Sequence, residues 1–229
     1  MLKKNKNNNK NTIFVDCFNT IIFRKIKKNL VFKNWATAVS NMFNIKAKIF
    51  YKTYKQTNFK LCFKKLFTSF TLQEDFDSVL TKMYQKLVKR YNWLEQSNFI
   101  DVAKKIYINK ELENFKVNEN LLAFLQAEKN KGKNIYLVSD FYYKSDIFKF
   151  WFNKLNILHI FDKIFSSADF NKEKATTKIY KHLLKTLSLN PKEVIMYGDN
   201  VWSDVMMAKL CGLNAKRIKV KQRRKYEKN

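Results

Sequence analysis

Three apolar runs in this chain each end in a polar residue that can carry chemistry. The runs and the residues that follow them are 13–15 before Asp16, 135–138 before Ser139, and 194–197 before Gly198 and Asp199. Short apolar runs are typical of buried parallel strands, and the carboxyl ends of parallel strands meet in one crevice at the edge of the sheet. The sequence therefore predicts an α/β fold in which these polar residues converge on one site.

The interval between the first two runs predicts a second module inserted into the sheet. It is far longer than a single strand-to-helix connection, and its apolar residues recur at helical spacing. Three such sets are Trp35, Val39, Met42 and Phe43; Phe76, Val79, Leu80, Met83, Leu87 and Tyr91; and Ile100, Ala103, Ile106 and Tyr107. We expect a Rossmann-like three-layer core with a parallel sheet over residues 12–23 and 116–220, and an inserted α-helical domain over residues 24–115.

The two ends of the chain differ in composition from the rest. Residues 1–11 are dominated by Lys and Asn and are predicted to be disordered. A basic run lies between Lys216 and Lys225, and residues 221–229 are predicted to form a solvated basic tail.

Candidate site residues follow from the chemistry that the strand ends permit. A carboxylate such as Asp16 that attacks a phosphate dianion is repelled by it, so the site needs a divalent cation and a fixed ammonium group. Lys174 would supply the ammonium, and the Ser139 hydroxyl and the backbone of Asp140 would donate hydrogen bonds to the phosphate. Hard oxygen ligands of the kind that Mg²⁺ prefers are offered by Asp16, Asp199, Asp204 and the Phe18 backbone carbonyl.

These residues resemble the motifs of the haloacid dehalogenase superfamily, a group of hydrolases with an aspartate nucleophile on a Rossmann-like core. The resemblance covers residues 12–23 and about 131–216. It implies an aspartyl-phosphate that water hydrolyses. The matching positions are Asp16, which would attack phosphorus; Thr20, which would lie close to the phosphate; and Ser139, Lys174, Asp199 and Asp204.

A more local resemblance is to one branch of that superfamily, which is often encoded beside glycosyltransferases for surface polysaccharides. The branch reads S-D-x-Y and K-x-x-G-x-(L/I)-Y, and this chain has SDFY from Ser139 and KATTKIY from Lys174, with Thr177 in place of the Gly. The resemblance implies a helical cap over a small soluble substrate. That substrate would be a sugar, polyol or amino-alcohol phosphate, used in capsule or surface polysaccharide biosynthesis.

Phe18 departs from the phosphatases of the superfamily, most of which carry an Asp two positions after the nucleophile as a general acid. General acid catalysis is worth about 10²–10⁴-fold in rate, so a catalytically weak binding or regulatory protein is one alternative. A 2-haloacid dehalogenase is another, because halide leaves without a proton. Asp199 and Asp204 favour phosphate, since the dehalogenases need no metal and usually lack this acidic motif.

The net charge of +27 raises the question of nucleic acid as a partner. Only five of the 46 basic residues are Arg, whereas Lys, Asn, Phe, Ile and Tyr are plentiful. These residues have AT-rich codons, so base composition accounts for the Lys excess. We therefore expect a small phosphorylated metabolite as the partner and no specific nucleic acid; the oligomeric state is not predicted.

Two smaller features bear on location and on the substrate. Cys17, Cys62 and Cys211 do not form the even, spaced set of a disulfide framework, and no apolar run is long enough to span a membrane. We expect a cytoplasmic protein. An acidic group from Glu74 to Asp77 would either meet a substrate amine or complement the dipole of a helix that begins there.

Overall fold

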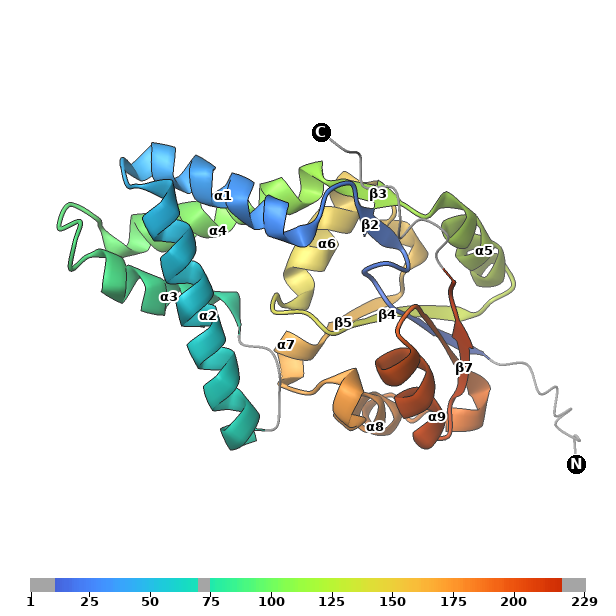
Figure 1. The fold of residues 1–229 in the computed structure, drawn as a ribbon. Helices are drawn as coiled ribbons and strands as arrows, with labels where there is room; N and C mark the ends of the chain where they lie inside the picture. Colours follow the sequence, from blue (N-terminus) through green and yellow to red (C-terminus); the bar gives the residue numbers. More distant parts are fainter. Residues whose placement is uncertain (1–10, 70–74, 220–229) are drawn as a thin grey trace, which may run out of the picture. The chain divides into compact units, whose positions relative to one another are not determined.

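The structure, a computed structural model, describes residues 11–69 and 75–219 and divides into two compact units (Figure 1). Within the described residues, unit 1 takes residues 11–22, 118–140 and 144–219, and unit 2 takes residues 23–69, 75–117 and 141–143. The predicted disordered start, except for Asn11, and the predicted basic tail lie outside the described residues.

Unit 1 is built on a five-stranded sheet in the order β5-β4-β1-β6-β7, in which every neighbouring pair is parallel. The three apolar runs of the sequence form its central strands. The strand bounds are β1 Thr12–Val15, β4 Asn134–Ser139, β5 Lys163–Ser166, β6 Val194–Gly198 and β7 Asn214–Arg217. The predicted α/β fold with a parallel sheet is confirmed.

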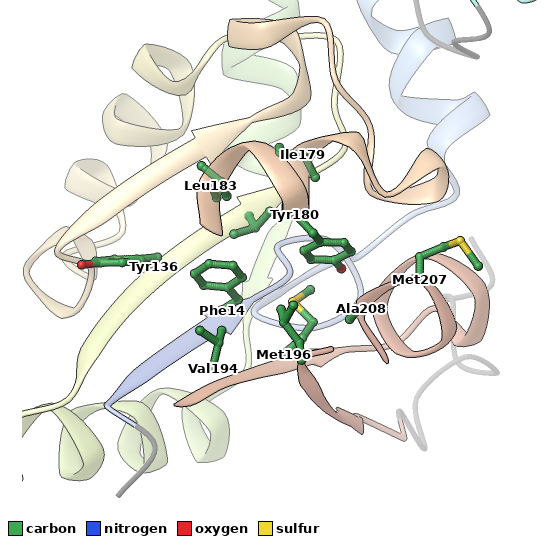
Figure 2. Packing of buried hydrophobic residues seen from close by; sticks show 11 residues of the cluster. Phe14, Tyr136, Ile179, Tyr180, Leu183, Val194, Met196, Met207 and Ala208 are labelled. Carbon is green, nitrogen blue, oxygen red and sulfur yellow. The ribbon is translucent and has the colours of Figure 1, made fainter. Parts of the chain in front are cut away.

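Helices cover both faces of this sheet. On one face, Phe14 of β1 lies in register with Tyr136 of β4 and Met196 of β6, and the row packs against α8 and α9 (Figure 2). On the other face, Phe124 of α5 packs edge-on against Tyr197. The helix bounds of unit 1 are α5 Glu119–Asn130, α6 Ser145–Lys154, α7 Ser167–Phe170, α8 Lys178–Thr186 and α9 Met207–Leu210; short 3₁₀ or π turns are η1 Leu158–Ile160, η2 Lys174–Thr176, η3 Pro191–Glu193 and η4 Val201–Met206.

Unit 2 is helical, as expected for the insertion, and has an aromatic core. The indole of Trp35 is fully buried, donates a hydrogen bond of 2.8 Å to the Ala103 carbonyl and packs edge-on against Phe50. Its elements are α1 Lys28–Phe43, α2 Ala47–Ser69, α3 Phe76–Leu87 and α4 Gln96–Glu113, with a two-stranded sheet of β2 Ile22–Arg24 and β3 Phe115–Val117. None of the helices within the described part of the chain is both long and apolar enough to cross a membrane.

Two details differ from the sequence expectations. Met42 belongs to an apolar set at helical spacing, yet its side chain is 66% exposed. The stripe of α1 that packs inward runs through Val39 to Phe43, whose ring lies 5.3 Å from that of Phe99, and Met42 lies beside this stripe. Lys216 begins the basic run but lies inside β7, so the run starts within the last strand of the sheet.

Thr177 has a left-handed backbone conformation, with φ of 63° and ψ of −11°, between η2 and α8. A β-branched residue is strained there, whereas Gly adopts positive φ without a steric penalty. This is the position at which the resembling branch has Gly. The backbone geometry therefore gives a physical reason for the glycine of that motif.

We predict that Thr177→Gly stabilises the protein. Relief of left-handed strain is worth about 1–2 kcal/mol, and the greater freedom of Gly in the unfolded chain costs about 0.5–1 kcal/mol, so a net gain of about 0.5–1 kcal/mol is expected in urea unfolding. The control is Thr176→Gly, where φ is not positive and the same change should destabilise. An equal loss in the free energy of unfolding for Thr177→Gly and Thr176→Gly would contradict backbone strain at Thr177.

Candidate active site

The carboxyl ends of three adjacent strands bring the predicted residues together in unit 1. Asp16 follows β1, Ser139 ends β4 and Asp199 follows β6. Because β1 lies between β4 and β6 in the sheet, these three residues lie at one edge of it. The convergence expected from the apolar runs is thus present in the fold.

Lys174 joins two carboxylates at this edge. Its ammonium lies 2.5 Å from Asp16 Oδ1 and 2.7 Å from Asp204 Oδ1, and the side chain is 2% exposed. Burial alone would lower the pKa of Lys174, but the charges of Asp16 and Asp204 outweigh it and raise the pKa well above its usual value. Lys174 therefore carries its positive charge at neutral pH.

Asp16 is a buried carboxyl with an unusual pKa. Its second oxygen, Oδ2, accepts a hydrogen bond of 3.1 Å from the Thr20 hydroxyl. Burial is the main cause that raises the pKa of Asp16 to about 7; the charge of Lys174 opposes the rise, and the charges of Asp204 and Asp199 add to it. The rise therefore comes chiefly from the loss of water around the carboxylate.

The segment after β6 is shaped to place Asp204. A Cβ added to Gly198 would lie 2.3 Å from Asp204 Oδ2, so only glycine leaves room for this carboxylate. Asp204 Oδ2 also accepts the Asn200 backbone N–H at 3.0 Å. The Asn200 side chain in turn caps η4 by accepting the N–H groups of Trp202 and Ser203.

The side chains of Asp140 and Ser139 differ in their hydrogen bonding. Both carboxylate oxygens of Asp140 accept the Lys174 backbone N–H, at 2.9 and 3.0 Å. Burial raises the pKa of Asp140, although the charge and N–H of Lys174 oppose the rise. The Ser139 hydroxyl is buried and has no hydrogen-bond partner among the described residues.

A cation site is offered by the three acidic side chains. One carboxylate oxygen from each of Asp16, Asp199 and Asp204 lies within 4.8 Å of the others, and all three residues are buried. Carboxylate oxygens at this spacing suit a hard divalent cation such as Mg²⁺. The donor set thus fits the metal that the sequence predicted.

Phe18 occupies the place of the missing general acid, and its ring packs within unit 1. It meets Phe148 at 6.2 Å and Trp151 at 6.3 Å between ring centroids, both in edge-on geometry. Its backbone forms an isolated bridge with Ile22. The side chain therefore has a packing role on α6 and offers no proton to a leaving group.

Two supporting residues were not predicted from the sequence. Tyr180, the last residue of KATTKIY, donates a hydrogen bond of 2.9 Å to the Ser203 carbonyl and so ties α8 to the segment that carries Asp204. Asn118 caps the N-terminus of α5, and its side-chain amide donates a hydrogen bond of 2.9 Å to the Thr20 carbonyl. The tyrosine at the end of the K-x-x-G-x-(L/I)-Y motif could have indicated the role of Tyr180, whereas no motif in the sequence indicates the role of Asn118.

Comparison with solved structures finds the same fold in several hydrolases. A HAD phosphatase from Thermococcus onnurineus is 18% identical with a TM-score of 0.57, covering 94% of this chain and 89% of that one. A 2-haloacid dehalogenase from Pseudomonas syringae pv. Tomato DC3000 is 10% identical with a TM-score of 0.61, covering 89% and 84%. YfnB from Bacillus subtilis, in a structure bound to magnesium, is 15% identical with a TM-score of 0.54, covering 89% and 84%.

At these identities the structures show the fold alone. No curated protein matches the chain significantly. A family model described as haloacid dehalogenase-like hydrolase matches residues 10–212, which is most of the chain and includes both units in large part. The chain belongs to the haloacid dehalogenase-like hydrolase family.

Proposed function

We propose that this hydrolase is a Mg²⁺-dependent phosphatase that acts on a small soluble phosphomonoester. The observation that carries the proposal is the cluster of three buried carboxylates around one buried lysine. A 2-haloacid dehalogenase needs no metal, so its reaction does not require three carboxylates in one site. A phosphatase needs a divalent cation to offset the charge of its substrate.

Charge balance supports the metal. Asp16, Asp199 and Asp204 carry three negative charges when ionised, and Lys174 carries one positive charge, which leaves two negative charges in a buried site. Unbalanced charge in a buried site is costly, and the charges of Asp204 and Asp199 add to the rise that burial causes in the pKa of Asp16. These three acids would hold Mg²⁺, which supplies charge neutralisation to the phosphoryl oxygens, and the Phe18 carbonyl is a further candidate ligand.

The residues of the site then divide the work of phosphoryl transfer. The Asp16 carboxylate forms a bond to phosphorus as the bond from phosphorus to the leaving oxygen breaks, and the leaving oxygen takes up a proton from solvent water. Lys174 is held by Asp204 beside Asp16, where its charge offsets that of the attacking carboxylate. The unpartnered Ser139 hydroxyl is available to donate to a phosphoryl oxygen. Water then attacks phosphorus and releases phosphate and Asp16.

The resemblance supports a substrate class. We propose that unit 2 acts as a cap that selects a sugar, polyol or amino-alcohol phosphate used in capsule or surface polysaccharide biosynthesis. Of the acidic group that could meet a substrate amine, Glu74 lies outside the described residues, and Asp75 caps α3 by accepting from Ser78 N at 2.8 Å. Asp77 is in turn paired with Lys104 at 2.8 Å.

A second candidate is kept because of Phe18. Its ring packs on Phe148 and Trp151 where phosphatases of the family have an acid. A halide leaving group would need no acid, and a protein without turnover would need none either. Dehalogenase or binding activity is therefore the alternative to be tested beside phosphate release.

We predict that phosphate release requires Mg²⁺ and stops in excess chelator. The same metal should raise the thermal unfolding midpoint, because a ligand at one hundred times its Kd adds about 2.7 kcal/mol of stability. Sodium at equal ionic strength is the control. Full turnover with chelator, or chloride release from a 2-haloacid, would refute the metal assignment and favour the dehalogenase.

We predict that Asp16→Asn lowers kcat by about a thousandfold or more, because it removes the nucleophile. Folding should be retained, since burial already favours the neutral form of Asp16 and the amide is nearly the same shape. The control is Asp101→Asn on the exposed surface of α4. An Asp16→Asn enzyme with a tenth of the original rate would exclude Asp16 as nucleophile.

We predict that the rate depends steeply on the pKa of the leaving group, because Phe18 gives no proton to it. Aryl phosphates should be hydrolysed at least about a hundredfold faster than alkyl phosphates, a factor within the range that general acid catalysis supplies. Steady-state kcat/KM across phenyl phosphates of graded pKa measures the slope. A flat series would mean that another residue acts as the acid.

A further inference from the structure

The backbone of Lys174 is held by a carboxylate from a distant part of the chain. Asp140 follows the last residue of β4, and both of its oxygens accept the Lys174 backbone N–H, at 2.9 and 3.0 Å. The two residues are 34 positions apart, and both belong to unit 1. Phosphoryl transfer as proposed uses the Lys174 ammonium but gives the Asp140 carboxylate no part in the reaction.

The start of η2 has no other acceptor of its own for this N–H group. Lys174 is the first residue of η2, and the first N–H groups of a helical turn have no partner inside the turn. Glu173, at the cap position, makes no capping hydrogen bond with its side chain. Asp140 therefore does for η2 what a cap residue does for an ordinary helix, although it comes from the end of a strand.

Lys174 is consequently fixed at both ends. Asp140 holds its backbone, while its ammonium lies 2.5 Å from Asp16 Oδ1 and 2.7 Å from Asp204 Oδ1. The side chain between these ends is buried, and close packing leaves it little room to adjust to a shift of the backbone. A misplacement of about 1 Å at a catalytic group can lower a rate about a hundredfold.

The contacts of Asp140 favour its ionised form, which asparagine cannot imitate. Burial raises the pKa of Asp140, but the charge of Lys174 and the N–H groups of Lys174 and Ala175 oppose the rise. Hydrogen bonds donated to a carboxylate stabilise its charged form. An amide in its place has one acceptor oxygen and a donor NH₂ group, which would face the Lys174 N–H donor.

We propose that Asp140 is a positioning residue of the active site, whose carboxylate fixes the Lys174 backbone so that the ammonium stays beside Asp16. This inference rests on the proposed function and adds to it a residue that acts through Lys174. The side chain of Asp140 sets where the positive charge meets the phosphoryl group, and takes no part in bond formation itself.

The test compares Asp140→Asn with a matched control, Asp162→Asn. Asp162 also accepts a backbone N–H, that of Ile135 at 2.8 Å, and pairs with Lys129 at 2.9 Å. It precedes β5 and contacts the start of β4, so it lies at the edge of the sheet opposite to the active site. Both changes remove one charge and one acceptor with little change of shape, so a loss that is only structural should appear in both variants.

We expect Asp140→Asn to lower kcat for p-nitrophenyl phosphate by about ten- to a hundredfold in the presence of Mg²⁺, because the ammonium loses its alignment. Asp162→Asn should leave kcat unchanged. Thermal unfolding shows the temperature at which both variants are folded, and the rates are compared there. Full kcat in Asp140→Asn, or an equal loss in the two variants, would overturn the proposal.

Binding without turnover shows whether the effect passes through Lys174. Calorimetry is done with Mg²⁺ alone and with inorganic phosphate in the presence of Mg²⁺. Lys174 is proposed to meet the phosphate and not the metal, so Asp140→Asn should bind phosphate about tenfold more weakly, as the loss of one charge-assisted contact gives, and should keep its affinity for Mg²⁺. An equal loss for both ligands would mean a general disruption of the site and would overturn the proposal.

A crystal structure of Asp140→Asn separates this inference from the proposed function, because it needs no turnover. We expect Lys174 Nζ to lie beyond hydrogen-bond distance of Asp16 Oδ1. A displaced ammonium, in a protein whose unchanged form releases no phosphate from any ester, would support the positioning role and refute the phosphatase. Phosphate release by the unchanged enzyme, with Lys174 unmoved in the variant, would do the reverse.

Discussion

The two ion pairs of the buried Lys174 ammonium hold the candidate active site together. Lys174 lies between Asp16 and Asp204, so a residue of η2 joins the end of β1 to the segment after β6. Several other features keep this arrangement in place: Asp140 holds the Lys174 backbone, Gly198 leaves room for Asp204, and Thr177 turns the chain into α8 at positive φ. Without Lys174, three buried carboxylates would face one another unbalanced.

Much of this was predictable because it depends on local sequence. A short apolar run that ends in Asp16 or Ser139 predicts a buried strand with a polar end, and parallel pairing then brings the ends together. The apolar sets at helical spacing in unit 2 predicted its helices. In α3 the apolar members of the set, from Phe76 to Leu87, are buried as the spacing indicates. The prediction failed at Met42, because an apolar residue next to a buried stripe can still face solvent, as Met42 does beside Phe43.

The rest depends on contacts between distant residues, which a single sequence does not reveal. Arg24 and Glu111 are 87 positions apart and have no motif between them. Phe18 was read as a missing acid, whereas its aromatic partners on α6 show that the position is also part of the packing of unit 1. Asp140 was expected to meet the phosphate through its backbone, and the contact of its carboxylate with the Lys174 backbone N–H was not predicted. Such roles arise from contacts made in the folded protein, and no local pattern in the sequence predicts them.

A quenched reaction measures whether Asp16 forms a covalent bond to phosphorus. The enzyme is mixed with Mg²⁺ and an aryl phosphate, stopped in acid within the first turnover, and digested for peptide mass spectrometry. We expect a phosphoryl group on the peptide that contains Asp16; it should be absent in Asp16→Asn and should decay as phosphate is released. Phosphate release with this peptide unmodified at every time point would contradict the account and point to direct attack by water.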